Sequence, residues 1–131
     1  MTKRKENNMR GLLLDVEHDE VKIVEANELE DYYRLMGCDT IEINVRKIRG
    51  RYFDIICDEE GLFQAEPTVS AVDSQGMTMF VGSLIICGEA DTDGKERSLT
   101  DEDIAHIRKC ILRLTSIKNP MPHHLLCFVE Y

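Results

Sequence analysis

The feature that most constrains the fold is a series of short apolar runs, each ended by glycine, proline or a cluster of acids. The most apolar run is "MTMFVGSLIICG" (77–88), which contains β-branched residues and has a glycine at each end. A continuous apolar run of this length and composition is typical of a buried central strand. We therefore predict one strand at 77–88, with Gly82 marking a bulge within it.

Other runs predict the strands around it. "TIEINV" (40–45) alternates strictly, which predicts a strand with Ile41, Ile43 and Val45 on the core face and a second face in water. Three further segments are predicted to be strands, the first two of them as a hairpin: "RGLLLDV" (10–16), "VKIVEA" (21–26) and a short segment at 69–72.

The strand at 40–45 is expected to continue through a second hairpin. Its tip should lie at residues 49–51, where glycine is flanked by two arginines. A three-residue loop there would set Val45 opposite Ile55 and Arg46 opposite Asp54. This register would place apolar pairs in the core and pair charges on the other face.

Two segments show apolar residues at helical spacing. The first, at about 28–36, has Asn27 as a candidate N-cap and Gly37 as a stop signal. The second, at about 101–116, follows the candidate N-cap Thr100 and carries three acids in its first turn, where the helix dipole favours them. The sequence therefore predicts an α+β fold: a mainly antiparallel sheet of about five to seven strands, with the short and the longer helix packed on it.

Length and cysteine content bound the organisation of the chain. At 131 residues it is expected to form a flexible basic leader (1–8), a single α+β domain (9–118) and a C-terminal tail or last strand (119–131). An exposed strand in that tail would offer an edge for a homodimer. Five cysteines without CxxC spacing indicate reduced, buried thiols. Because no run is long enough for a signal peptide or a membrane span, we expect a cytoplasmic protein without membrane contact.

The charge balance limits the partners. The formal net charge is −9, and because four of the 16 basic residues but only one of the 25 acidic ones lie in the first ten positions, residues 11–131 carry −12. Such a surface disfavours direct binding of nucleic acid, which needs clustered positive charge. It fits docking on a basic protein, and it equally fits a role in solubility alone.

The segment "CGEADTDGKERSLTDEDIAHIRKCI" (87–111) places acids around a glycine, as calcium loops do. An EF-hand loop that begins at Glu89 would have Asp91 and Asp93 at ligand positions, but its twelfth position is a threonine instead of a bidentate glutamate. Helix capping explains the acids that follow Thr100. Glu89, Asp91 and Asp93 therefore remain as a candidate acidic surface.

One basic cluster is present in this acidic chain. "RKIRGR" is a candidate site for a phosphate, a nucleotide or the acidic patch of a partner. The simpler alternative is that its cations only offset neighbouring carboxylates. The members of the cluster, with the tyrosine that follows, are Arg46, Lys47, Arg49, Arg51 and Tyr52.

We predict no metal site, cofactor or catalytic group. His123, His124 and Cys127 have a spacing found in zinc sites, but the sequence offers no obvious second ligand pair. Cys38 is expected to be the most exposed cysteine, and the acid that follows it discourages the thiolate that a nucleophile requires.

The order of segments resembles a known family. The stretches "CDTIEI" (38–43), "FDIICDEEGL" (53–62) and "SLTDEDI" (98–104) carry the resemblance, which covers roughly residues 9–115. The chain is similar to a numbered, uncharacterised family of small proteins, a domain of unknown function encoded largely by gut Firmicutes, their phages and their conjugative elements. This resemblance implies a compact α+β fold and a mobile-element setting, and it transfers no catalytic residue.

These observations favour a non-enzymatic binding module, because no Ser/His/Asp set, phosphate-binding glycine loop or paired-carboxylate motif is visible. The first hypothesis is a counter-defence inhibitor, encoded by a phage or mobile element, that docks its acidic surface on a basic host or immune protein. The second is sequestration of a small phosphorylated or nucleotide ligand by the basic cluster. A cryptic hydrolase is the third.

Overall fold

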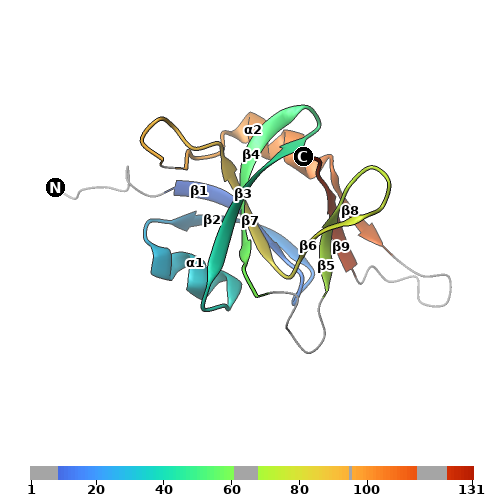
Figure 1. Ribbon diagram of the computed structural model, residues 1–131, viewed down its shortest axis with the longest axis horizontal. Coiled ribbons are helices and arrows are strands. Elements are labelled where there is room, and N and C mark those ends of the chain that lie inside the picture. The colour runs from blue at the N-terminus through green and yellow to red at the C-terminus, as the bar shows by residue number, and fades with distance from the viewer. Residues whose placement is uncertain (1–8, 61–67, 95, 115–123) are drawn as a thin grey trace.

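The computed structural model describes residues 9–60, 68–94, 96–114 and 124–131. The elements in chain order are β1 (Met9–Asp15), β2 (Glu20–Ala26), α1 (Leu29–Met36), β3 (Ile41–Ile48), β4 (Arg51–Asp58), β5 (Val69–Val72), β6 (Thr78–Val81), β7 (Leu84–Gly88), α2 (Asp101–Arg108), β8 (Ile111–Leu114) and β9 (His124–Phe128). The described residues thus form an α+β fold, as predicted, with two mainly antiparallel sheets (Figure 1). The five-stranded sheet has the order β2-β1-β7-β4-β3, and the four-stranded sheet has the order β6-β5-β9-β8.

The main core lies between the two sheets. Every second side chain of β1, β7 and β4 points into it, so that Leu12, Ile86 and Ile55 lie side by side across the five-stranded sheet. The helix α2 adds Ile104 and Ile107 to the same core. Burial of each such aliphatic side chain contributes about 1.5–3 kcal/mol, which makes this core the main driving force for folding.

A smaller core covers the outer face of the five-stranded sheet. There Leu13, Ile56 and Ile85 are buried, and α1 packs Tyr32 and Leu35 against them. The five-stranded sheet is therefore buried on both faces at its centre, whereas its edge strand β3 extends beyond the cover that α1 provides (Figure 1).

The apolar run at 77–88 is not one strand, contrary to the prediction. It is divided into β6 and β7, which lie in different sheets. Gly82 allows the crossing, because its φ of +86° is a conformation that L side chains rarely adopt, and its amide donates to the Thr68 carbonyl at 2.8 Å. Periodicity could not reveal this division, since both halves carry buried residues and each is long enough to be a strand.

The β3–β4 hairpin turns through two residues and not three. Arg49 and Gly50 have φ values of +49° and +82°, as in the tight turns whose twist matches that of the strands. The register is therefore shifted by one residue from the prediction, and Val45 lies opposite Asp54 instead of Ile55. A one-residue shift moves paired side chains to the other face. Ile55 thus points into the main core, while Val45 points outward.

Both helices begin with a capping box. Thr100 caps α2 as predicted, whereas α1 is capped by Glu28, one residue after the predicted Asn27. The Asp31 carboxylate accepts hydrogen bonds from the amides of Asn27 at 2.7 Å and Glu28 at 3.0 Å. These two bonds, together with the guanidinium of Arg34, lower the pKa of Asp31 to about 2. Asp31 therefore stabilises the N-terminal end of α1 by accepting hydrogen bonds from backbone amides.

The helix α2 is shorter than predicted. It ends at Arg108, and the amide of Cys110 donates to the Ile107 carbonyl at 2.8 Å. Residues Ile111–Leu114 then form β8, which pairs antiparallel with β9. The apolar spacing that suggested a longer helix is also compatible with a strand after a break, and pairing with β9 decides between the two.

The C-terminal strand pairs within its own chain. β9 lies parallel to β5 and antiparallel to β8, so this interior strand offers no free edge to a second copy. Four of the five cysteines are buried and all five are free thiols, which confirms the interpretation of their apolar runs. In the described part of the chain, no helix has the length and apolarity needed to cross a bilayer.

Candidate functional site

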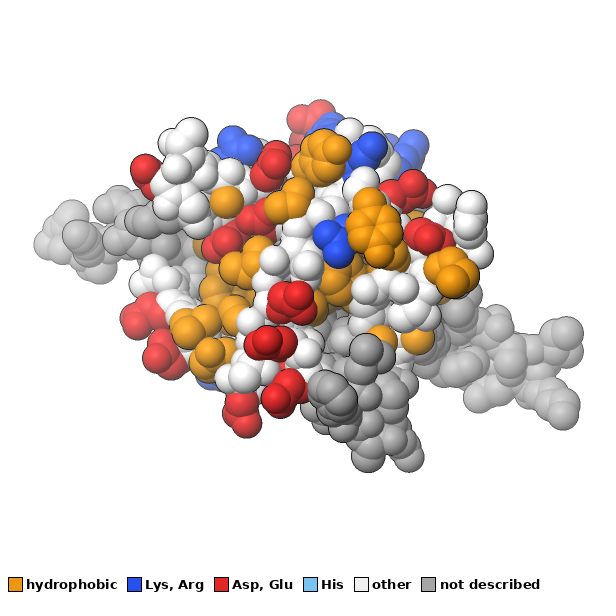
Figure 2. Space-filling view, viewed as in Figure 1, with side chains coloured by type: hydrophobic (Ala, Val, Ile, Leu, Met, Phe, Trp, Pro, Cys, Tyr) orange, Lys and Arg blue, Asp and Glu red, His pale blue; other side chains and the backbone are white. Residues whose placement is uncertain are grey.

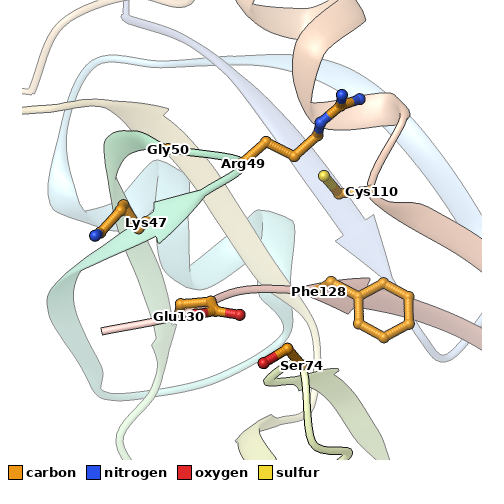
Figure 3. Close-up of a pocket in the computed structure, with 7 residues that line it drawn as sticks. All are labelled: Lys47, Arg49, Gly50, Ser74, Cys110, Phe128 and Glu130. Carbon is orange, nitrogen blue, oxygen red and sulfur yellow. The ribbon is translucent and has the colours of Figure 1, made fainter.

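A cavity of about 550 Å³ lies between the tip of the β3–β4 hairpin and the four-stranded sheet (Figure 3). A cavity of this volume suits a small molecule. The Lys47 amide donates to the Glu130 carbonyl at 2.7 Å, and the Glu130 amide donates to the Lys47 carbonyl at 2.8 Å, so the hairpin is joined to the segment after β9. The residues that line the cavity are Lys47, Arg49, Gly50, Ser74, Cys110, Phe128 and Glu130.

Arg49 is the notable cation at this cavity. It makes no ion pair among the described residues. Its φ of +49° is uncommon for a residue with a Cβ, and asparagine or glycine would adopt this turn position with less strain. In Figure 3 the Arg49 guanidinium extends above Cys110 and away from Phe128 and Ser74, and the Lys47 amine points away from the other lining side chains. Local strain of this kind is often found at binding sites.

The structure separates the other members of the predicted basic cluster. The Arg46 guanidinium lies over the rings of Phe80 at 5.5 Å and Tyr131 at 4.7 Å. The Lys47 ammonium lies 5.6 Å from the centre of the Tyr52 ring, on the opposite face of the hairpin. Because neighbouring residues of a strand point to opposite faces, cations that are adjacent in sequence do not converge on one ligand here.

Arg51 contacts α2 instead of the cavity. Its guanidinium lies 3.1 Å from the Asp103 carboxylate and 3.7 Å from that of Glu102. The Asp103 carboxylate also accepts from the Thr100 amide, so Arg51 joins the hairpin to the N-terminal end of the helix. The acids of the first helical turn thus have two structural roles, in capping and in ion pairing.

The edge of the five-stranded sheet exposes apolar side chains. Ile43 and Val45 are 48% and 45% exposed, on the face away from the main core. Along the free side of β3, the described residues form one bridge only, between Lys47 and Glu130. We call Ile41, Ile43 and Val45, with the free side of their backbone, the β3 edge. Figure 2 shows hydrophobic side chains beside carboxylates on the face where β3 lies in front.

A second hollow, of about 290 Å³, lies on the inner side of the β3 edge. We call it the edge groove, because it lies between β3 and β6, which are edge strands of the two sheets. Glu42 and Glu59, both exposed, contribute carboxylates to it, and Met79 and Phe80 contribute apolar surface. Arg46 also lines the groove, with its guanidinium over the Phe80 ring. An open strand, an apolar strip and acids are therefore found together at this side of the molecule.

Asp54 is a buried acid that was predicted to lie opposite Arg46. This prediction is wrong, because Arg46 lies opposite Phe53 and Asp54 lies opposite Val45. Asp54 is only 2% exposed, and one of its carboxylate oxygens has no hydrogen-bond partner among the described residues. Burial and the nearby charge of Glu96 raise its pKa, although the amide of Ala90 donates a hydrogen bond to the carboxylate. The signal that could have identified it is an acid inside the apolar run "FDIIC".

The acidic loop is held by its own hydrogen bonds. The Asp91 carboxylate accepts from the Asp93 amide at 2.9 Å, and Nε of Arg97 donates to the Glu89 carbonyl at 2.8 Å. The three predicted surface acids, Glu89, Asp91 and Asp93, are exposed. The described residues contain no group of three or more side chains that could hold a metal ion. These acids therefore stay a predicted acidic surface.

The thiols are poor nucleophiles in this structure. Burial, with Asp58 adding to the effect, raises the pKa of Cys38 to about 11, and burial raises that of Cys127 to about 12. Burial also raises the pKa of Cys110, although Arg49 opposes the shift. A protonated thiol reacts slowly. His123, which belongs to the zinc spacing considered above, lies outside the described residues.

Comparison with known proteins identifies the family. Residues 9–111 match the sequence model of the family described as "Domain of unknown function (DUF3846)". No curated protein and no solved structure matches the chain. The match covers β1 through α2 and the start of β8, and thus includes both edge strands that border the edge groove. The chain belongs to the DUF3846 family.

Proposed function

We propose that the protein is a non-enzymatic module that binds a basic protein partner through the β3 edge and the carboxylates of the edge groove. The observation that carries this proposal is the exposure of Ile43 and Val45, 48% and 45%, on an open strand beside Glu42. Apolar side chains at the centre of an interface exclude water, and the charges around them select the partner. The β3 edge and the edge groove combine both properties.

The charge of the chain supports this partner class. A net charge of −9 attracts a basic protein over long range and repels nucleic acid. Because the sequence resembles proteins of phages and conjugative elements, we propose that a phage or mobile element encodes the module. In that setting, the module acts in the host cytoplasm as a counter-defence inhibitor, which occupies a basic surface of a host or immune protein such as a nucleic-acid channel.

The test compares Ile43→Lys with Ile23→Lys. Both isoleucines are 48% exposed and lie on the two edge strands of one sheet, so the substitutions remove the same apolar group and add the same charge. The measurement is cross-linking with mass spectrometry in extract of the native host cell. We expect a basic partner whose capture falls at least about ten-fold with Ile43→Lys and is unchanged with Ile23→Lys.

Salt dependence provides a second readout of the same experiment. Capture should weaken when the salt concentration rises from about 50 mM to about 500 mM, because exposed charges are then screened. Equal loss in both isoleucine variants, or capture that neither variant changes, would contradict docking through the β3 edge.

A second function, sequestration of a small phosphorylated ligand, is favoured by Arg49 alone. Its guanidinium, which has no ion-pair partner among the described residues, lies at the rim of a cavity of about 550 Å³ and offers the paired donors that phosphate oxygens accept. The ring of Phe128 and the hydroxyl of Ser74 line the same cavity and supply an apolar wall and a further donor.

Arg49→Asn is expected to separate binding from stability. Asparagine adopts positive φ more readily than arginine, so the variant should unfold at higher urea concentration, with a gain of about 0.5 kcal/mol. The same variant should lose calorimetric binding of adenosine monophosphate, whereas Arg51→Asn should retain it. Persistent binding to Arg49→Asn would exclude this cavity as the phosphate site, and a loss of stability would contradict the strain at Arg49.

A further inference from the structure

We infer that the β3 edge receives an extended segment of the partner as an additional strand of the five-stranded sheet, and that apolar and basic residues alternate in this segment. The inference rests on the proposed function and specifies its binding mode. In strand addition, main-chain hydrogen bonds supply affinity and alternate side chains supply specificity.

The backbone of β3 is oriented for this addition. Both the amide and the carbonyl of Lys47 bond to Glu130, so both groups point away from β4. Because these groups alternate in direction along a strand, those of Ile41, Ile43 and Val45 point the same way. No strand of the described chain pairs with β3 at these positions. The Val45 carbonyl accepts a hydrogen bond from the Arg46 guanidinium at 2.9 Å. The bridge to Glu130 is thus one rung of a ladder that can be extended.

The side chains on the two faces of β3 define which segment fits. On the outer face, Ile43 and Val45 offer β-branched neighbours to apolar residues of an added strand. On the inner face, the alternate residues of that strand enter the edge groove, where Glu42 and Glu59 are exposed. Lysine or arginine fits there, because the charged end pairs with a carboxylate while the aliphatic stem covers the apolar surface of Met79.

A second copy of this chain fits the β3 edge less well. Two β3 strands paired antiparallel about a two-fold axis at Ile43, the centre of the β3 edge, would bring the two Glu42 side chains diagonal to each other on one face. Like charges in such positions are destabilising. Each copy also carries a net charge of −9, which adds long-range repulsion. The occupant is therefore a basic segment of another protein.

The experiment measures fluorescence anisotropy of a capped peptide of about nine residues, in which valine and lysine alternate, with the full chain. The matched probe is the same peptide with N-methylated valine amides, which keeps the charge and the side chains but removes the ladder donors. The unmodified peptide should bind about ten-fold more tightly than the methylated peptide. It should also bind more tightly than a peptide with glutamate in place of lysine.

Ile43→Pro tests the same ladder from the side of the protein. Proline removes an amide that points away from β4, so the β3–β4 pairing is retained and circular dichroism should show an intact fold. Peptide affinity should fall about ten-fold. Ile43→Thr, which keeps the amide and the β-branch, should retain most of the binding.

The outcomes separate the binding mode from the proposed function. Equal affinity for the methylated peptide overturns strand addition, and docking itself still stands if Ile43→Lys loses the partner in cell extract. Equal affinity for the glutamate peptide overturns the basic character of the segment. A dimer in size-exclusion chromatography that the peptide dissociates would assign the β3 edge to a second copy and overturn the choice of occupant.

Discussion

Truncation of Ile86 to alanine is expected to lower the free energy of unfolding by about 3 kcal/mol. Ile86 is 0% exposed on the central strand β7, where it lies opposite Leu12 of β1 and Ile55 of β4. Both neighbouring strands are held by their ladders, so the cavity left by the missing atoms cannot close by a simple shift. The measurement is urea denaturation followed by circular dichroism. The slope of the free energy of unfolding against urea concentration should be unchanged.

Ile23→Ala is the matched control for this truncation. Ile23 belongs to the same sheet and lies opposite Leu12 on β2, but it is 48% exposed. Its truncation should cost less than about 1 kcal/mol, because roughly half of the Ile23 surface already contacts water. Similar losses for the two variants would show that the main core is not centred on β7.

The parts of the fold that the sequence predicts correctly are those decided by local chemistry. The opening hairpin of β1 and β2 follows from two short apolar runs around a polar turn, and the structure confirms it. Gly37 ends α1 with a φ of +68°, as its position after the last apolar residue predicts. Thr100 caps α2 because hydroxyl and acid lie three residues apart. Such signals act within one turn of chain and need no knowledge of distant partners.

The parts that fail depend on partners far along the chain. Whether the run around Gly82 is one strand or two is decided by two different sheets, β5 pairing with β6 and β4 with β7. Whether Ile111–Leu114 continues a helix is decided by β9. In both segments the apolar pattern is compatible with either outcome, so tertiary pairing overrides local preference.

The candidate sites depend on the register of one turn. Arg49 and Gly50 form a two-residue turn where three residues were predicted, and this single difference moves each β3 side chain to the other face relative to the side chains of β4. Alternation correctly grouped Ile43 with Val45, but it could not show that this face is left uncovered. The β3 edge, the edge groove and the buried carboxylate of Asp54 all follow from this register.

Asp54→Asn is expected to stabilise the protein at neutral pH by about 1–3 kcal/mol, because it removes a charge from a buried position beside Glu96. The ionised carboxylate is buried beside Glu96, and one of its oxygens has no partner among the described residues. Asparagine has nearly the same shape, can still accept from the Ala90 amide and carries no charge. The measurement is the free energy of unfolding of the natural protein and the variant, from urea denaturation at a series of pH values.

The pH dependence gives this prediction its sign. Because the folded protein raises the pKa of Asp54, it holds that proton more tightly than the unfolded chain does. The stability contributed by Asp54 is therefore complete below the ordinary value of 3.8 and is lost as the pH rises through the raised value. The asparagine variant lacks this loss, so its advantage should be small near about pH 3 and reach a plateau toward neutral pH.

Asp93→Asn, on the same loop as Glu96, shows whether the effect belongs to the buried position. Its side chain is exposed, so the substitution should change stability by less than about 0.5 kcal/mol at every pH. Carboxylates present in all three proteins, such as that of Asp31, contribute equally to each free energy of unfolding and therefore cancel when these free energies are subtracted. A constant advantage of Asp54→Asn at all pH values would mean that the Asp54 carboxyl does not titrate differently in the folded state, and that its burial carries no electrostatic cost.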